Sequence, residues 1–140
     1  MMRPRILPLA LLAVFTTLGL TGCGNKSMTM PDLFPETVGA WHRTATSEPA
    51  AAGNPDEIDA QSIEKIRAAS YEGPGKLEAR VYQLATPAVA LDVVQRWHAT
   101  ADSVFFNQDR FLVVLKWQAA DRKAVQEFVT VIDGKLHTKP

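Results

Sequence analysis

The chain has 140 residues with 15 basic and 15 acidic side chains, so its formal net charge at pH 7 is zero. This balance gives no electrostatic reason to expect nucleic acid as a partner. A single cysteine excludes an intramolecular disulfide, a zinc site of several thiolates and a Cys-x-x-Cys redox motif.

The first 22 residues have the composition of a secretory signal. Residues 1–5 are cationic and residues 6–20 are almost uncharged and apolar. A basic start, a short apolar stretch and small residues before a cut are typical of such a signal. The apolar run is shorter than the roughly 20 residues that span a bilayer. We therefore expect residues 1–22 to be a signal peptide and not a membrane helix.

The signal ends in Leu20-Thr21-Gly22-Cys23, which places the only cysteine directly after small residues. This sequence resembles the lipobox of bacterial lipoproteins. The resemblance implies cleavage before Cys23, diacylation of Cys23 and, usually, acylation of the new amino group. A plain secretory signal with an incidental cysteine is the alternative reading.

A lipid on Cys23 would make the membrane the first partner of this protein. Each buried methylene contributes about 0.8 kcal/mol, so two or three acyl chains would hold the protein without help from its folded part. Gly24 follows the cysteine, and for a source with two membranes the resemblance implies transport to the outer one. We expect residues 23–30 to be the lipidated cysteine and a flexible tether, and residues 31–140 to form a single domain.

The start of the predicted domain carries apolar anchors and then a polar stretch. Residues 31–42 suit a lid over one face of a sheet, with the anchors Leu33, Phe34, Val38 and Trp41, and residues 41–45 can add an edge strand. Cover by a partner or an apolar ligand is the alternative. The composition of residues 44–56 predicts an exposed loop, and Asn54-Pro55 predicts a short helix over residues 55–62.

Two strand-strand-helix units follow along the chain. In the first, residues 65–71 and 77–84 read as strands around the turn Gly73-Pro74-Gly75. Thr86 as N-cap and Pro87 at the first helical position predict a helix to about Ala99. In the second unit, residues 103–106 and 110–117 predict a hairpin. A helix then begins near Asp121, and Gly134 is expected just past its end.

These elements predict an α+β domain. We expect a four-stranded, possibly five-stranded, antiparallel sheet in ββαββα order with both helices packed on one face. The other face would carry Leu112 and Val114. Because an open antiparallel face is normally polar, something should cover this one.

No catalytic, cofactor-binding or metal-binding residue is predicted. His42, His98 and His137 are far apart in the sequence, and Asp56, Glu57 and Asp59 lack calcium-loop spacing. Asp102, Asp109 and Asp121 are expected to cap or turn the chain. The charged residues of the strands are expected to form exposed pairs across neighbouring strands: Glu78, Arg80, Arg110 and Lys116.

The sequence therefore predicts a lipid-anchored protein of the cell envelope, with Cys23 as the one functional site residue. The first hypothesis is a non-catalytic interaction or assembly domain that docks another envelope protein. The alternative is a tethered binder or enzyme for a small envelope metabolite or glycan, with the open sheet face as its cleft. A deep cavity with converging polar groups would favour the alternative.

Overall fold

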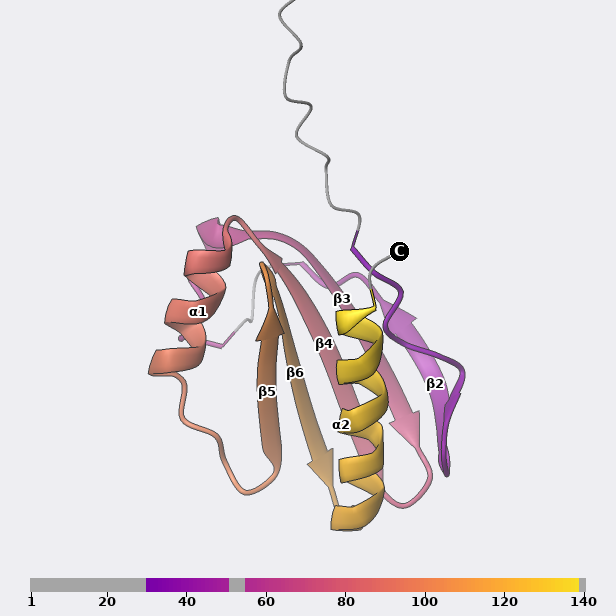
Figure 1. The fold of residues 1–140 in the computed structure, drawn as a ribbon. Coiled ribbons are helices and arrows are strands. Elements are labelled where there is room, and N and C mark those ends of the chain that lie inside the picture. Colours follow the sequence, from indigo (N-terminus) through magenta and orange to yellow (C-terminus); the bar gives the residue numbers. More distant parts are fainter. Residues whose placement is uncertain (1–29, 51–54, 139–140) are drawn as a thin grey trace, which may run out of the picture.

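The computed structural model describes residues 30–50 and 55–138. Its six strands form one antiparallel sheet in the order β1-β2-β3-β4-β6-β5 (Figure 1). The elements are, in chain order, β1 (Thr37–Val38), β2 (Trp41–Ser47), a 3-10 turn (Ala60–Ser62), β3 (Ile63–Glu72), β4 (Lys76–Leu84), α1 (Pro87–Arg96), β5 (Ser103–Gln108), β6 (Phe111–Gln118) and α2 (Arg122–His137).

The predicted fold class is confirmed, but the sheet is larger than expected. The protein is α+β, with an antiparallel sheet and two helices. The order ββαββα holds from β3 to α2, and two further strands precede it. The expected edge strand at residues 41–45 is β2, which is longer and carries β1 beyond it through a tight turn. Gly39 has a φ of +57° in that turn, which favours glycine.

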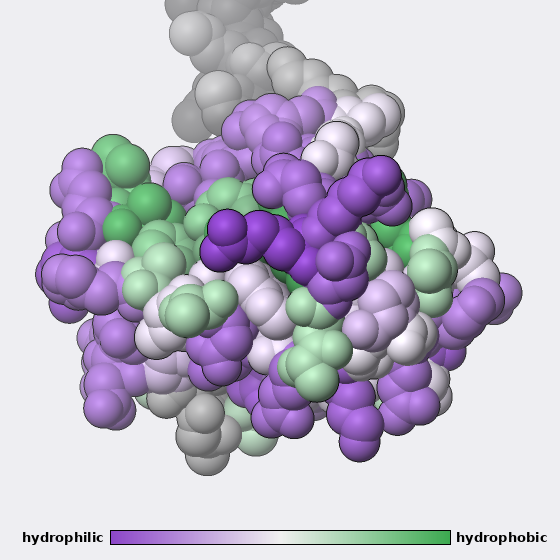
Figure 2. Space-filling view, turned by 90° about the horizontal axis from the view of Figure 1, so that it is seen from below, coloured by the Kyte–Doolittle hydropathy of each residue, from purple (hydrophilic) through white to green (hydrophobic). Residues whose placement is uncertain are grey.

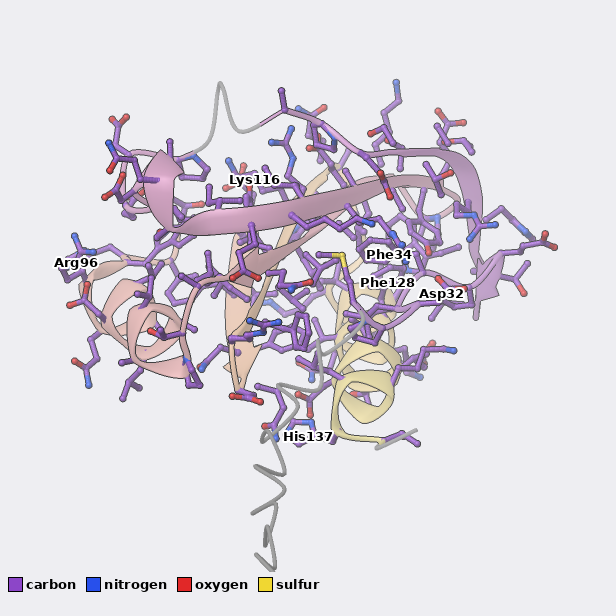
Figure 3. All side chains as sticks on the ribbon, turned by 90° about the horizontal axis from the view of Figure 1, so that it is seen from above. Asp32, Phe34, Arg96, Lys116, Phe128 and His137 are labelled. Atoms are coloured by element: carbon purple, nitrogen blue, oxygen red, sulfur yellow. The ribbon has the colours of Figure 1, made fainter. Side chains whose placement is uncertain are left out.

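The two helices pack on opposite faces of the sheet, which corrects the prediction that they share one face. Val113 and Leu115 lie in the same buried cluster as Phe128 of α2, while Leu112 and Val114 lie in the cluster of Val93 in α1. All five residues from Phe111 to Leu115 are buried. A strand that is apolar on both sides needs cover on both sides, and each helix supplies one cover. Seen from above, α1 and α2 lie on either side of β5 and β6 (Figure 3).

The N-terminal segment from Met30 to Val38 is here called the strap. Its apolar side chains are buried, as the lid prediction required, but they cover the opposite face of the sheet from the one predicted. Leu33, Phe34 and Val38 belong to the α2 cluster, which we call the α2 face. Met30, expected at the end of the flexible tether, is also buried there. The face with Leu112 and Val114, here called the α1 face, is covered by α1 instead.

Polar groups fasten the strap to the sheet. The hydroxyl of Tyr71 donates to the carbonyl of Pro35 at 2.9 Å, and Arg43 donates to the carbonyl of Phe34. Behind the strap, Phe128 meets Tyr71 edge-to-face at 4.8 Å and Trp41 at 6.2 Å between ring centroids. The strap is thus an integral layer of the domain.

Several element ends differ from the predictions. The first helix stops at Arg96 and not near Ala99, with its predicted N-cap Thr86 in place. The second begins after Asp121 as predicted, but continues through Gly134 to His137, because Leu136 extends the buried stripe. The helix predicted over residues 55–62 is a turn and a short 3-10 segment. Strand β2 reaches Ser47, so the loop predicted from residue 44 begins later.

The turn between β3 and β4 needs glycine for reasons of space. A Cβ atom on Gly73 would come within 2.2 Å of the Ala40 carbonyl oxygen, and one on Gly75 within 2.7 Å of the Ala119 carbonyl oxygen. Two other loops therefore pack directly on this turn. The turn itself was predicted from its composition.

Candidate functional site

A polar groove lies on the uncovered part of the α1 face. Ser70, Glu78, Lys116 and Ser103 lie opposite one another on β3, β4, β6 and β5 and form a row across the sheet. None of these four residues belongs to the apolar cluster under α1. The groove has a volume of about 420 Å³, and its polar lining residues include Thr44, Ser70, Glu72, Lys76, Glu78, Asp102, Lys116 and Gln118.

The charges of the groove are mixed in sign. Glu78 pairs with Arg80 on its own strand, although its cross-strand neighbour is Lys116. The ammonium groups of Lys76 and Lys116 form no ion pair with other described residues. The groove thus offers free cationic donors beside the carboxylates of Glu72 and Asp102.

Arg80 links this groove to the buried part of the α1 face. Burial lowers the pKa of Arg80, but its hydrogen bonds with Glu78 and Tyr82 outweigh that effect and raise the pKa above its ordinary value. Burial also raises the pKa of the Tyr82 hydroxyl. Arg80 therefore stays charged and Tyr82 stays neutral at physiological pH.

A second charged cluster lies at the opposite end of the central strands. Arg110 pairs with Glu64 at 3.3 Å, and the same carboxylate accepts from the side chain of Gln83 at 2.9 Å. The Nε atom of Arg110 is buried without a partner among the described residues. The expected pairs across neighbouring strands do not form among the described residues, because Glu78 pairs with Arg80 on its own strand, Arg110 pairs with Glu64 on the non-adjacent strand β3, and Lys116 forms no ion pair.

The remaining candidate residues do not converge on a site. His42 lies on β2, His98 follows α1, and His137 ends α2 beside Asp133. Asp59 caps the 3-10 turn, and Asp121 caps α2, as expected for acids at element ends. No group of three or more potential metal ligands occurs in the described ranges.

Each of the three tryptophans contributes to packing. The indole N–H of Trp41 donates to the carbonyl of Ala124 at 3.0 Å, which fixes α2 on the sheet. Trp97 stacks on Phe105 at 5.0 Å, and Trp117 packs against the α2 cluster. Trp41, predicted as one of the apolar anchors of the lid, is buried.

Cys23, the predicted lipidation site, lies outside the described residues, as do the predicted signal peptide and all of the predicted tether except Met30. Among the described helices, none has the length and apolar character needed to cross a membrane.

Comparison of the chain with protein-family profiles, with curated proteins and with solved structures gives no match. Function must therefore be argued from the residues of this chain.

Only part of the groove could be predicted from the sequence. Glu78, Arg80 and Lys116 stood out as charges within otherwise apolar strands, whereas Ser70 and Asp102 join them only through strand register. Polar residues at alternate positions of a strand were the available signal, since they mark one face.

Proposed function

We propose that this chain is a lipid-anchored protein of the bacterial cell envelope, whose folded domain is a non-catalytic module that docks another envelope protein. The observation that carries this proposal is Leu20-Thr21-Gly22-Cys23 after a cationic and apolar start. With a non-Asp residue at position 24, the outer membrane is the proposed location if the source has two membranes.

The position of the strap supports this proposal. The strap enters the fold at the upper end of Figure 1, beside the end of α2, while the β3–β4 turn and the end of β6 lie at the lower end. The polar groove is lined by residues from that lower end, including Glu72, Lys76 and Gln118. A domain hung from Cys23 would therefore turn its groove away from the bilayer and toward other envelope components.

The packing of the strap also suits a tethered domain. Leu33 and Phe34 are fully buried, so the part of the chain that would follow a lipid anchor is fixed to the core. The domain needs no further contact with lipid to stay at the membrane, because two or three acyl chains bind far more strongly than one.

The test is a Cys23→Ala variant expressed in a bacterial host with labelled palmitate, compared with a Ser27→Ala variant of the same segment. We expect the wild type and Ser27→Ala to take up label and to fractionate with membranes. Cys23→Ala should take up no label and should remain at the size of the uncleaved precursor. Normal processing and membrane association of Cys23→Ala would refute the anchor.

The groove favours a second candidate function, a tethered binder or enzyme for a small polar metabolite or glycan. Its volume of about 420 Å³ falls within the range of small-molecule sites. Soluble envelope saccharides and metabolites can be screened for a ligand that raises the melting temperature of the protein. This candidate function predicts that Lys116→Ala weakens the binding of such a ligand. The change should weaken binding without lowering the stability of the free protein.

A further inference from the structure

Strand β5 forms one edge of the sheet, and its outward backbone groups can be assigned. The N–H of Trp117 donates to the carbonyl of Asp102 at 3.0 Å, immediately before β5. Bonded and non-bonded pairs alternate along an antiparallel ladder. The even-numbered residues of β5 therefore bond to β6, and the odd-numbered residues turn their N–H and C=O groups outward.

Two of these outward N–H groups have no acceptor. Ser103 donates to the carbonyl of Thr100 at 3.3 Å, but the N–H groups of Phe105 and Asn107 donate to no group within the described residues. An edge of this kind is a template for another strand unless it is protected.

Charges, proline and bulges, which commonly protect an edge strand, do not occur within β5. The strand Ser103–Gln108 contains no charged residue and no proline, and its register with β6 is regular throughout. The opposite side of the sheet differs, because β1 has two residues and the register of β2 shifts between Arg43 and Ala45. Short edge strands and bulges discourage pairing.

Apolar side chains flank the β5 edge on both sides. Phe105 and Trp97 stack on the α1 side, while Val104 and Phe106 pack against the α2 cluster, and all four remain partly exposed. Leu91 of α1 is 52% exposed. Figure 2 shows hydrophobic side chains gathered on the left, the side on which α1 lies in Figure 1. Alternating side chains of an added strand would contact one helix side and then the other.

Acidic residues at the two ends of β5 indicate which kind of strand would pair with it. Asp102 and Asp109 are exposed and bracket the uncharged strand. In an antiparallel pair of two copies the outward odd-numbered residues face one another, so with Phe105 opposite Phe105 each Asp102 would face Gln108 and neither aspartate would gain a cationic partner. A strand with a basic residue at each end would instead form two attractive pairs.

We propose that β5 is a strand-addition site for an extended segment of another protein. In that segment, uncharged residues that alternate between apolar and polar lie between two basic residues. This inference gives the interaction module a partner class and a binding mode, and it rests on the proposed function for the statement that the occupant is an envelope protein. Main-chain hydrogen bonds from Phe105 and Asn107 would supply affinity, and the two aspartates would supply selectivity.

The probe is a fluorescein-labelled octapeptide of six alternating threonine and valine residues with a lysine at each end. A second peptide carries glutamate at both ends. Binding to the full chain in mild detergent is measured by fluorescence anisotropy. We expect the lysine-ended peptide to bind about tenfold more tightly than the glutamate-ended one, and Asp102→Asn with Asp109→Asn to abolish this preference. Asparagine tolerates the left-handed backbone of residue 109.

Asn107→Pro removes one outward N–H and leaves the bonds to β6 intact, because proline is tolerated at such edge positions. We expect this substitution to lower the affinity for the lysine-ended peptide by about tenfold or more. Asn107→Ala is the matched control, since it keeps the N–H and loses only the side chain, and it should bind like the wild type. Equal affinities for Asn107→Pro and Asn107→Ala would overturn the proposal.

Amide hydrogen exchange gives a readout that does not depend on the proline variant being folded. In the free wild-type chain the amides of Phe105 and Asn107 should exchange rapidly, and the lysine-ended peptide should slow both. Protection of these amides in the absence of peptide, with a dimer in sedimentation, would make a second copy the occupant and refute the proposal. Protection in a monomer would mean that the chain's own remaining residues cover the edge, which also refutes it. Neither result depends on whether Cys23 carries lipid.

Discussion

Tyr71 shows how one buried residue joins the strap to the sheet. Its hydroxyl donates to the Pro35 carbonyl at 2.9 Å, and its ring packs on Phe128. We expect Tyr71→Phe to keep the packing and to lose one net hydrogen bond, which lowers the free energy of unfolding by about 1 kcal/mol. Urea unfolding at neutral pH measures this loss. Unchanged stability would mean that the hydroxyl does not fasten the strap.

The same residue predicts a pH dependence. Burial raises the pKa of Tyr71 from 10.0 to about 12 in the folded protein. Above pH 10 the unfolded chain releases this proton first, so the stabilisation is present below pH 10 and is lost as pH rises toward 12. The unfolding free energy of Tyr71→Phe should therefore fall less steeply than that of the wild type between about pH 10 and pH 12. Parallel curves would contradict the raised pKa.

Substitution by alanine is expected to have opposite effects on stability at Gly75 and at Gly134. A Cβ on Gly75 would lie 2.7 Å from two carbonyl oxygens, whereas one on Gly134 would meet nothing within 4 Å. Gly75→Ala should cost about 1–3 kcal/mol through overpacking. Gly134→Ala, inside α2, should stabilise by about 0.5–1 kcal/mol because alanine favours helix. Thermal unfolding of both variants tests the pair, and equal signs would contradict it.

At the scale of elements, α1 is fixed by its buried stripe and not by its exposed apolar residue. Val93 is 1% exposed and Leu91 is 52% exposed. Val93→Ala should lower the free energy of unfolding by about 2 kcal/mol through lost burial and a cavity, while Leu91→Ala should change it by less than about 0.5 kcal/mol. Denaturant unfolding separates the two, and a larger loss for Leu91→Ala would mean that α1 is rotated.

The strap is the second element whose role can be measured. Phe34 is buried on the α2 face, so Phe34→Ala should destabilise the domain by about 3–5 kcal/mol. Thr46→Ala, on the exposed part of β2, is the control and should be nearly neutral. Similar small effects of both substitutions would show that the strap is not part of the core.

How far the sequence predicts the elements depends on whether the signal is local. Thr86 and Asp121 cap the helices as predicted, because a cap depends on neighbouring residues alone. The choice of face depends on how distant segments pack. Since β6 is apolar on both sides, its pattern fits a helix on either face, and the prediction of a shared face was wrong.

Considered as a whole molecule, the candidate site follows the same division. Lys116 and Glu78 could be recognised in the sequence, but their row with Ser70 depends on register across three strands. The free edge of β5 depends on which strand ends the sheet, and strand order is not written in any one segment. By contrast, Cys23 was found from a contiguous motif, and its lipidation remains a prediction.

The most direct test of the proposed anchor is mass spectrometry of the N-terminal peptide of the protein isolated from its natural cell membranes. The account predicts that the mature chain begins at Cys23 and that this residue carries a thioether-linked diacylglycerol. Matched digestion after alkaline release of the ester-linked chains should lower the mass by those chains alone. A mature chain that begins elsewhere, or an unmodified thiol at Cys23, would contradict the account.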